Sequence, residues 1–195
     1  MLTKLRGALK PLTTKVGTAL SRAGVTPNEL TVTGLLLALL TPLTSYVGLK
    51  WGTLLLFICS CLMDYLDGAV AKASGRSSKE GAFLDSFSDR VSDAAFTSAL
   101  LFFGFPPWLV IYLITASFLI SYARARGEAL GLRLEGVGLM ERGERLIALG
   151  AMMVLIGVNL PFIAFWAGVA TAVLDTITVL QRAHHIYVGL RNAFT

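Results

Sequence analysis

Charged residues are scarce in this chain of 195 residues: they make up 15% of it, whereas hydrophobic residues make up 55%. A soluble domain of this size has about 25% charged residues. Residues 35–49, 101–120 and 146–170 form long apolar runs. Such runs approach the ~20 residues that a helix needs to cross the hydrocarbon core of a bilayer. The composition therefore excludes a soluble domain and predicts an integral membrane protein with one domain and no separate soluble module.

Cysteine is also rare, and a secretory signal peptide is not apparent. The two cysteines, Cys59 and Cys61, stand two positions apart on an apolar segment, so we interpret them as packing residues and not as a disulfide or metal site. Residues 1–22 are basic and lack the compact apolar core of a signal peptide. We expect residues 1–24 to form an amphipathic helix on the anionic membrane surface, with a solvated basic tail as the alternative, before a transmembrane core of residues 25–195.

Start signals and breakers divide this core into six predicted transmembrane helices, which makes the fold all-α. Thr26-Pro27-Asn28 marks a helix start, and Gly104–Pro107 and Asn159–Pro161 interrupt the apolar runs. The predicted helices are residues 28–46, 51–74, 79–103, 108–130, 141–158 and 162–182, with a basic tail to residue 195. Basic residues gather at the termini and in alternate connections, whereas the opposite loops carry only Lys50. By the positive-inside rule, both termini and the basic connections face the cytoplasm across the cell membrane, and we expect any active site to face it too.

Four aspartates stand within the second and third predicted helices, namely Asp64, Asp67, Asp85 and Asp89. An ionised Asp costs about 2.5–3.5 kcal/mol at the centre of a bilayer helix, so four of them need a compensating positive charge. The spacings of three and four residues place each pair on one helix face, and the short connection makes the two helices antiparallel neighbours. Oxygen ligands suit Mg²⁺ or Mn²⁺ better than zinc. Two such ions about 3.5–4 Å apart serve in-line phosphoryl displacement, which is the chemistry that these residues indicate.

The aspartates belong to a longer motif. It reads Asp64-x-x-Asp67-Gly68-x-x-Ala71-Lys72, eight further residues, then Gly81-x-x-x-Asp85-x-x-x-Asp89. This string resembles the signature of the CDP-alcohol phosphatidyltransferase family, and Lys72 stands at the one fixed position where the family usually has Arg. Lysine keeps the positive charge but lacks the bidentate fork of arginine. The six-helix layout extends the resemblance over nearly the whole chain.

The resemblance implies a reaction and the residues that perform it. The pyrophosphate of a CDP-lipid binds on two Mg²⁺ or Mn²⁺ ions, an alcohol attacks the phosphorus next to the lipid, and CMP leaves. Metal ligands are then Asp64, Asp67, Asp85 and Asp89, of which Asp89 is also the general base, a role that a carboxylate beside the metals can fill. The residues expected to bind the CDP-lipid are Asp64, Asp67, Gly68, Lys72, Arg76 and Ser78. The resemblance also implies a homodimer, which small residues such as Gly150 and Ala151 allow.

The acceptor alcohol is inferred from arginines around the connection of the fourth and fifth predicted helices and late in the sixth. As a cluster they indicate a phosphorylated acceptor, although flanking charge explains any single one equally well. The stretches that begin at Ser121 and Glu141 are similar to the inositol phosphate branch of the family, with Gly127 and Gly143 where Ala is expected. This similarity implies inositol 1-phosphate as the acceptor. The predicted acceptor-phosphate binders are Arg124, Arg126, Arg142, Arg145 and Arg182.

Two alternatives remain open at this stage. Glycerol 3-phosphate also suits an arginine cluster, which would make the protein a phosphatidylglycerophosphate-type synthase. Buried carboxylates also mark ion-coupled transporters, but those predict acids near the midplane with broken helices and inverted repeats, which this sequence does not suggest. The donor lipid is CDP-diacylglycerol or CDP-archaeol, and the low content of Asn, Gln and Cys, typical of thermophiles, favours archaeol. No nucleic-acid partner is expected.

Overall fold

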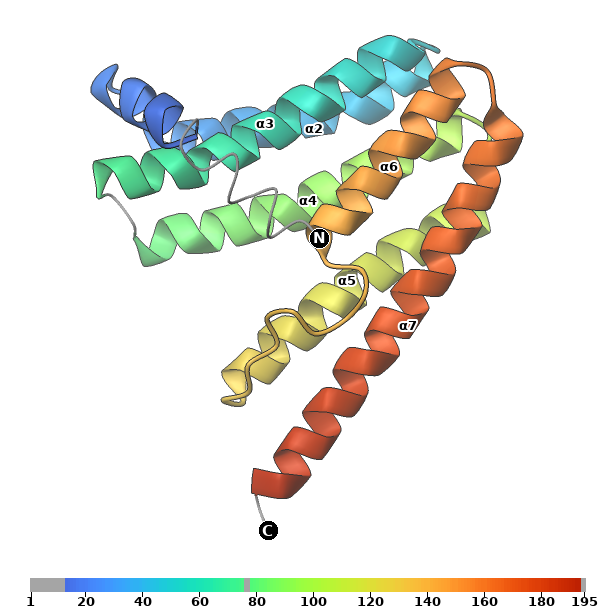
Figure 1. Ribbon diagram of the computed structural model, residues 1–195. Coiled ribbons are helices and arrows are strands. Elements are labelled where there is room, and N and C mark those ends of the chain that lie inside the picture. Colours follow the sequence, from blue (N-terminus) through green and yellow to red (C-terminus); the bar gives the residue numbers. More distant parts are fainter. Residues whose placement is uncertain (1–12, 76–77, 194–195) are drawn as a thin grey trace. The chain divides into compact units, whose positions relative to one another are not determined.

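The computed structural model describes residues 13–75 and 78–193, and this part of the chain is helical apart from short connections (Figure 1). A first helix covers residues 13–22. The others are α2 (Pro27–Tyr46), α3 (Lys50–Ser74), α4 (Lys79–Phe102), α5 (Pro107–Ala129), α6 (Arg142–Gly157) and α7 (Pro161–Ala193). The all-α prediction is confirmed, and the predicted bounds of the six core helices lie within one residue of the observed ones at every end except the last.

The predicted end of the last helix is wrong. Residue 182 was expected to close it, but α7 continues to Ala193. The prediction followed the fall in hydropathy, which marks the membrane boundary and does not itself end a helix. A glycine late in α7 packs closely on the connection that follows α5: a Cβ at Gly189 would lie 3.0 Å from Leu132 Cδ2. This contact gives the extended part of α7 a packing partner.

Four of the described helices, α2, α3, α5 and α7, are long and apolar enough to cross a membrane. The protein is therefore a multi-pass membrane protein. Helix α6 has 16 residues, about 24 Å at 1.5 Å per residue, which is shorter than a hydrocarbon core of ~30 Å. Helix α4 carries acidic and basic side chains along its first half. Length and hydropathy thus support four of the six predicted spans and leave those of α4 and α6 as predictions.

Tertiary contacts group the chain into a first unit, which ends at Ala99, and a second unit, which begins at Leu100. In the first unit α2 and α3 lie side by side (Figure 1). Their close approach is visible at Ser60, whose Oγ donates a hydrogen bond of 2.6 Å to the carbonyl of Gly34. The rings of Phe57 and Phe96 meet edge to face at 4.8 Å and connect α3 with α4. The prediction of a single domain stays a prediction.

The start of α2 follows from its sequence signal. Thr26 Oγ1 accepts the N–H of Glu29 at 3.3 Å, and the Glu29 carboxylate accepts the N–H of Thr26 at 2.8 Å. This reciprocal pair is a capping box, with Pro27 at the first helical position, so the predicted start signal is confirmed. It fixes the start of α2, where three residues of the site described below lie: Pro27, Asn28 and Thr31.

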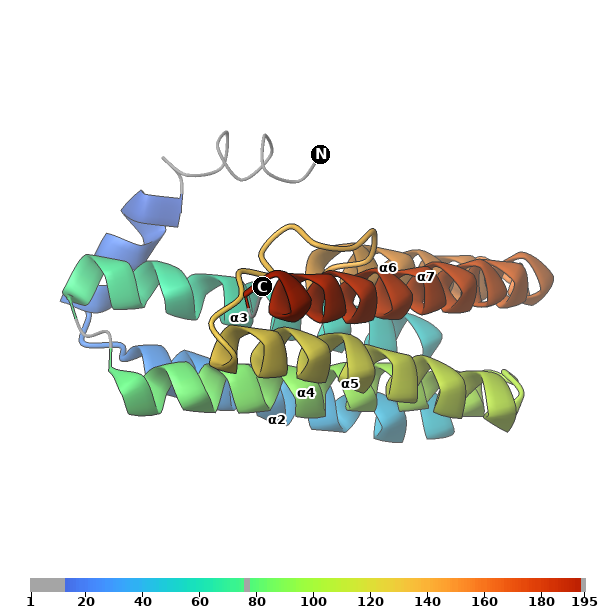
Figure 2. The same ribbon diagram turned by 90° about the horizontal axis from the view of Figure 1, so that it is seen from below.

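In the second unit, α5 and α6 both pack against α7. The side-chain hydroxyls of Tyr112 on α5 and Thr176 on α7 share a hydrogen bond. The connection between α5 and α6, residues 130–141, runs alongside α7 (Figure 2). We call this segment the α5–α6 connection.

Candidate metal and phosphoryl-transfer site

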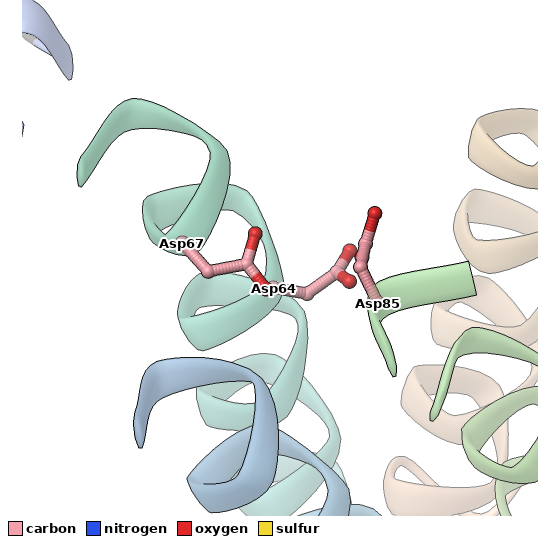
Figure 3. Close-up of side chains that lie close together, drawn as sticks. All are labelled: Asp64, Asp67 and Asp85. Carbon is pink, nitrogen blue, oxygen red and sulfur yellow. The ribbon is translucent and has the colours of Figure 1, made fainter. Parts of the chain in front are cut away.

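Three of the four predicted aspartates form a close cluster in the first unit. Asp64 and Asp67 lie on α3 and Asp85 lies on α4, and one carboxylate oxygen from each is within 4.8 Å of the others (Figure 3). Asp67 is 6% exposed, and the other two are half-buried. Helix α3 ends at Ser74, and the following Gly75 adopts a left-handed conformation with φ 66°, which is typical of a helix C-terminus. The close spacing of three oxygen donors fits a hard divalent cation such as Mg²⁺ or Mn²⁺.

Thr31 on α2 orients the most buried carboxylate of this cluster. Its Oγ1 donates a hydrogen bond of 2.6 Å to Asp67 Oδ2 within the buried interface of α2 and α3. The bond engages Oδ2 of Asp67, and the carboxylate also interacts with the backbone N–H of Gly68. Hydrogen bonds of this kind fix the geometry of metal-binding carboxylates. Sequence reasoning missed Thr31, because it took the start of α2 only as a helix signal.

A cavity of about 220 Å³ lies beside the cluster. Its lining residues come from α2, α3 and α4: Pro27, Asn28, Thr31, Asp67, Gly68, Ala71, Lys72, Ser78, Gly81, Ala82 and Asp85. Four of the predicted donor-binding residues, Asp67, Gly68, Lys72 and Ser78, are thus brought together. A Cβ at Gly68 would meet nothing within 4 Å, so this face stays open to a ligand. The exposed Lys72, beside carboxylates that can hold divalent cations, suits a pyrophosphate.

The remaining predicted residues of this half of the site behave differently. Arg76 lies outside the described residues. Asp89 is half-buried one turn beyond Asp85, and it is not a member of the close carboxylate cluster. Its Oδ2 lies 3.4 Å from Nη1 of Arg90, which also donates to the carbonyl of Ser86 at 2.6 Å. Its roles as fourth ligand and as base therefore stay predictions. Ser78 Oγ accepts the N–H of Gly81 at 3.0 Å and so caps the start of α4.

The predicted acceptor residues lie in the second unit. The Arg182 guanidinium interacts electrostatically with Arg124 and Arg145 and with the Glu141 carboxylate, so three of the five predicted arginines share one neighbourhood. They come from α5, α6 and α7. Arg145 is 6% and Arg182 2% exposed. Arg124 pairs with Glu128 at 2.8 Å, and Arg126 is exposed and Arg142 half-buried.

The two buried arginines already engage backbone carbonyls. Arg182 donates from Nε to Val137 at 2.9 Å and from Nη1 to Ile120 at 2.7 Å. Arg145 donates from Nη1 to the carbonyl of Met140 at 3.2 Å. The sequence left these side chains between phosphate binding and flanking charge, and it gave no sign of their hydrogen bonds to the α5–α6 connection. The glycine found where Ala was expected also has a packing reason, because Gly127 lies against Leu134 and Ile186.

The fold and the site define a helical membrane protein in which a cluster of carboxylates, suited to divalent cations, lies beside a cavity that suits a pyrophosphate. Residues 24–174 match the family model of CDP-alcohol phosphatidyltransferases. The chain is 41% identical to the archaetidylinositol phosphate synthase of Aeropyrum pernix, with 90% of each chain covered. It is 36% identical to the phosphatidylinositol phosphate synthase of Mycobacteroides abscessus, with 93% of this chain and 86% of that protein covered.

Two solved structures are also similar. The phosphatidylinositol phosphate synthase of Mycobacterium tuberculosis in complex with manganese and citrate matches with a TM-score of 0.78 and 34% identity, covering 90% of this chain and 88% of that one. The same enzyme with CDP-DAG bound matches with a TM-score of 0.77 and 33% identity, covering 91% and 94%. This chain therefore belongs to the CDP-alcohol phosphatidyltransferase family, as the motif had indicated.

Proposed function

We propose that this protein transfers the phosphatidyl or archaetidyl group of a CDP-lipid to a hydroxyl of inositol 1-phosphate and releases CMP. The observation that carries the proposal is the cluster of Asp64, Asp67 and Asp85 beside the cavity lined by Lys72. The relatives named as archaetidylinositol and phosphatidylinositol phosphate synthases support the choice of acceptor. The structure with CDP-DAG bound to a relative supports the choice of donor.

In this proposal, Asp64, Asp67 and Asp85 hold two Mg²⁺ or Mn²⁺ ions together with Asp89. The ions, when bound, neutralise the pyrophosphate and stabilise the charge that develops on the transferred phosphorus. The structure of a relative with manganese supports this metal class. Gly68, Lys72, Arg76 and Ser78 bind the CDP-lipid, whose phosphates lie against the open face at Gly68.

Asp89 acts as the general base. It takes the proton of the acceptor hydroxyl as that oxygen forms a bond to the phosphorus next to the lipid. The bond from that phosphorus to the bridging pyrophosphate oxygen breaks, and the electron pair leaves with CMP. A base placed near the reacting hydroxyl contributes about 10²–10⁴-fold to such a transfer.

The acceptor phosphate is bound by arginines of the second unit. The shared neighbourhood of Arg124, Arg145 and Arg182 supports this part of the proposal, because guanidinium groups hold phosphate with charge-assisted hydrogen bonds. Arg126 and Arg142 complete the proposed set. The same proposal includes six membrane spans, cytoplasmic termini, a cytoplasmic active site and a homodimer. Light scattering on the detergent-solubilised protein tests the dimer.

The test is CMP release by the purified protein with Mg²⁺ and a CDP-lipid, offered as both the diacylglycerol and the archaeol form. Inositol 1-phosphate, glycerol 3-phosphate and free inositol are supplied in separate reactions. We expect release with inositol 1-phosphate alone. Release with glycerol 3-phosphate alone would keep the family chemistry and overturn the acceptor assignment. Release with free inositol at the same efficiency would remove the role of the arginine cluster in binding a phosphate.

A further inference from the structure

The α5–α6 connection is tied to α7 by hydrogen bonds from two directions. The N–H of Met140 donates to Thr178 Oγ1 at 3.0 Å. Arg182, one turn further along α7, donates to the Val137 carbonyl at 2.9 Å. The four residues from Val137 to Met140 are therefore held at both ends by side chains of one helix.

Thr178 is suited to this tie. It is completely buried, and its hydroxyl donates to the Leu174 carbonyl of its own helix at 2.9 Å while it accepts the Met140 N–H. Both capacities of the hydroxyl are used, so its removal leaves a buried backbone N–H of the connection without this acceptor.

Gly138 lets the connection approach Thr178. Its φ is +110°, a conformation that L side chains rarely adopt, and a Cβ placed there would lie 2.5 Å from Thr178 Cγ2. Close contact and backbone conformation thus require glycine at this position for two separate reasons. Beyond this contact the connection is not densely packed on α7, because Val137 and Gly138 form one wall of a cavity of about 550 Å³ whose other wall is the later part of α7, from Gln181 to Asn192. The connection can therefore shift toward the cavity if the tie to Thr178 is lost.

The same four residues support the buried arginines. The Met140 carbonyl accepts from Arg145, and the Val137 carbonyl accepts from Arg182. A shift of the connection would move the acceptors to which both guanidinium groups are bonded. Arg145 and Arg182 are two of the three arginines that share one neighbourhood.

We propose that Thr178, together with Gly138, is a positioning residue for the acceptor: it fixes the α5–α6 connection so that Arg145 and Arg182 are correctly placed to bind a phosphorylated alcohol. Thr178 itself touches neither substrate. The inference rests on the proposed function, because the phosphate of the acceptor is what the two arginines are there to bind.

The first variant is Thr178→Val, which keeps the shape of the side chain and removes the hydroxyl. We expect the KM for inositol 1-phosphate to rise roughly tenfold, the usual effect of losing one buried hydrogen bond. The KM for the CDP-lipid and kcat should change by less than about twofold, by the same reasoning. Thr178→Ser keeps the hydroxyl and should stay close to the wild type.

A matched control is Thr171→Val. Thr171 is also buried on α7, and its hydroxyl donates at 2.8 Å to the Ala167 carbonyl of the same helix. This substitution removes an intrahelical bond like that of Thr178 to Leu174 and leaves the Met140 tie intact. The difference between the two valine variants therefore isolates the bond to Met140.

The second variant is Gly138→Ala, in the wild type and in Thr178→Ser. Alone, it should raise the acceptor KM, because the new methyl overlaps Thr178 Cγ2. Serine lacks Cγ2 but retains the hydroxyl, so the double variant should recover part of the acceptor affinity. Recovery of this kind is a coupling that two independent losses of stability would not show.

The outcomes separate the two proposals. An acceptor KM for Thr178→Val equal to that of Thr171→Val would overturn the positioning role while leaving the proposed function intact. Equal increases in the KM of both substrates would also overturn it, since they would indicate general damage to the fold. Absence of CMP release by the wild type with every phosphorylated acceptor would overturn the proposed function itself.

Discussion

The two units of the molecule build their candidate sites in different ways. In the first unit, the acidic cluster comes from helical spacing: Asp64 and Asp67 share a face of α3, and Asp85 meets them from α4. In the second unit, the arginines that share a neighbourhood come from α5, α6 and α7. The two buried ones donate to backbone carbonyls of the irregular α5–α6 connection and, in the case of Arg182, also to the carbonyl of Ile120 within α5. The first site depends on local periodicity and the second on tertiary packing.

This difference matches a division of chemistry. The first unit carries the residues proposed to bind the metal ions and the CDP-lipid. These residues belong to the signature motif of the family. The second unit carries the residues proposed for the acceptor. Variants of the first unit should therefore change metal dependence, kcat or the KM of the CDP-lipid. Variants of the second unit should change the KM of the acceptor.

Removal of the metal is expected to have the largest effect. Chelation by EDTA should abolish CMP release, because the cluster of Asp64, Asp67 and Asp85 then lacks the charge that neutralises the pyrophosphate. Mg²⁺ or Mn²⁺ should restore activity better than Zn²⁺, since the donors are oxygens. The metal titration of Thr178→Val should coincide with that of the wild type. Full activity after dialysis against EDTA would exclude a metal-dependent mechanism.

Asp89→Asn is expected to lower kcat by about 10²–10⁴-fold, the contribution of a general base. The close cluster of Asp64, Asp67 and Asp85 stays intact in this variant, and the Asn amide oxygen can still act as a ligand, so the affinity for Mn²⁺ should fall far less than kcat. Calorimetric titration with Mn²⁺ measures this separately from turnover. A large loss of Mn²⁺ affinity would show that Asp89 is mainly a ligand, and kcat like that of the wild type would remove it as the base.

Helical spacing made much of the first unit predictable. The start of α2 was set by Thr26 and Pro27, and the i, i+3 spacing of Asp64 and Asp67 was sufficient to place both carboxylates on one helix face. The i, i+4 spacing of Asp85 and Asp89 likewise predicted one shared face of α4. Of these two, however, only Asp85 belongs to the close cluster. A shared helix face does not determine how deep along the neighbouring helix each side chain lies, because that depth depends on how α3 and α4 pack.

The second unit was less predictable for a physical reason. The partner of Thr178 is the N–H of Met140, which lies 38 residues away in an irregular segment, and no periodic pattern relates two such positions. Likewise, the sequence marked Arg182 as a cation but could not show that its N–H groups are bonded to carbonyls of Val137 and Ile120. The extension of α7 beyond residue 182 was missed because a fall in hydropathy indicates where a helix leaves the membrane. It does not indicate where the helix ends.

The next largest effect is expected from Thr31→Val, which removes the hydrogen bond to Asp67 Oδ2. Loss of a partner that orients a metal-binding carboxylate typically costs 10–100-fold in metal affinity or activity. The concentration of Mg²⁺ that gives half-maximal rate should rise within that range, with the KM for inositol 1-phosphate unchanged. Thr33→Val is the matched control, because the Thr33 hydroxyl donates at 2.7 Å to the Glu29 carbonyl of its own helix. Equal metal requirements of the two variants would contradict the orienting role of Thr31.

The smallest effect is expected from Lys72→Arg, at the one position where the motif departs from the family signature. Lys72 lines the cavity beside Asp67 and Asp85. An arginine there can donate two parallel hydrogen bonds to a phosphate, so the KM for the CDP-lipid should fall by roughly two- to fivefold. The same exchange at Lys79, which is exposed and does not line the cavity, should change nothing. A rise in the KM would mean that this cavity is shaped for a point charge. A change in the acceptor KM would instead show that Lys72 also serves the acceptor, and the division of labour between the two units would no longer hold.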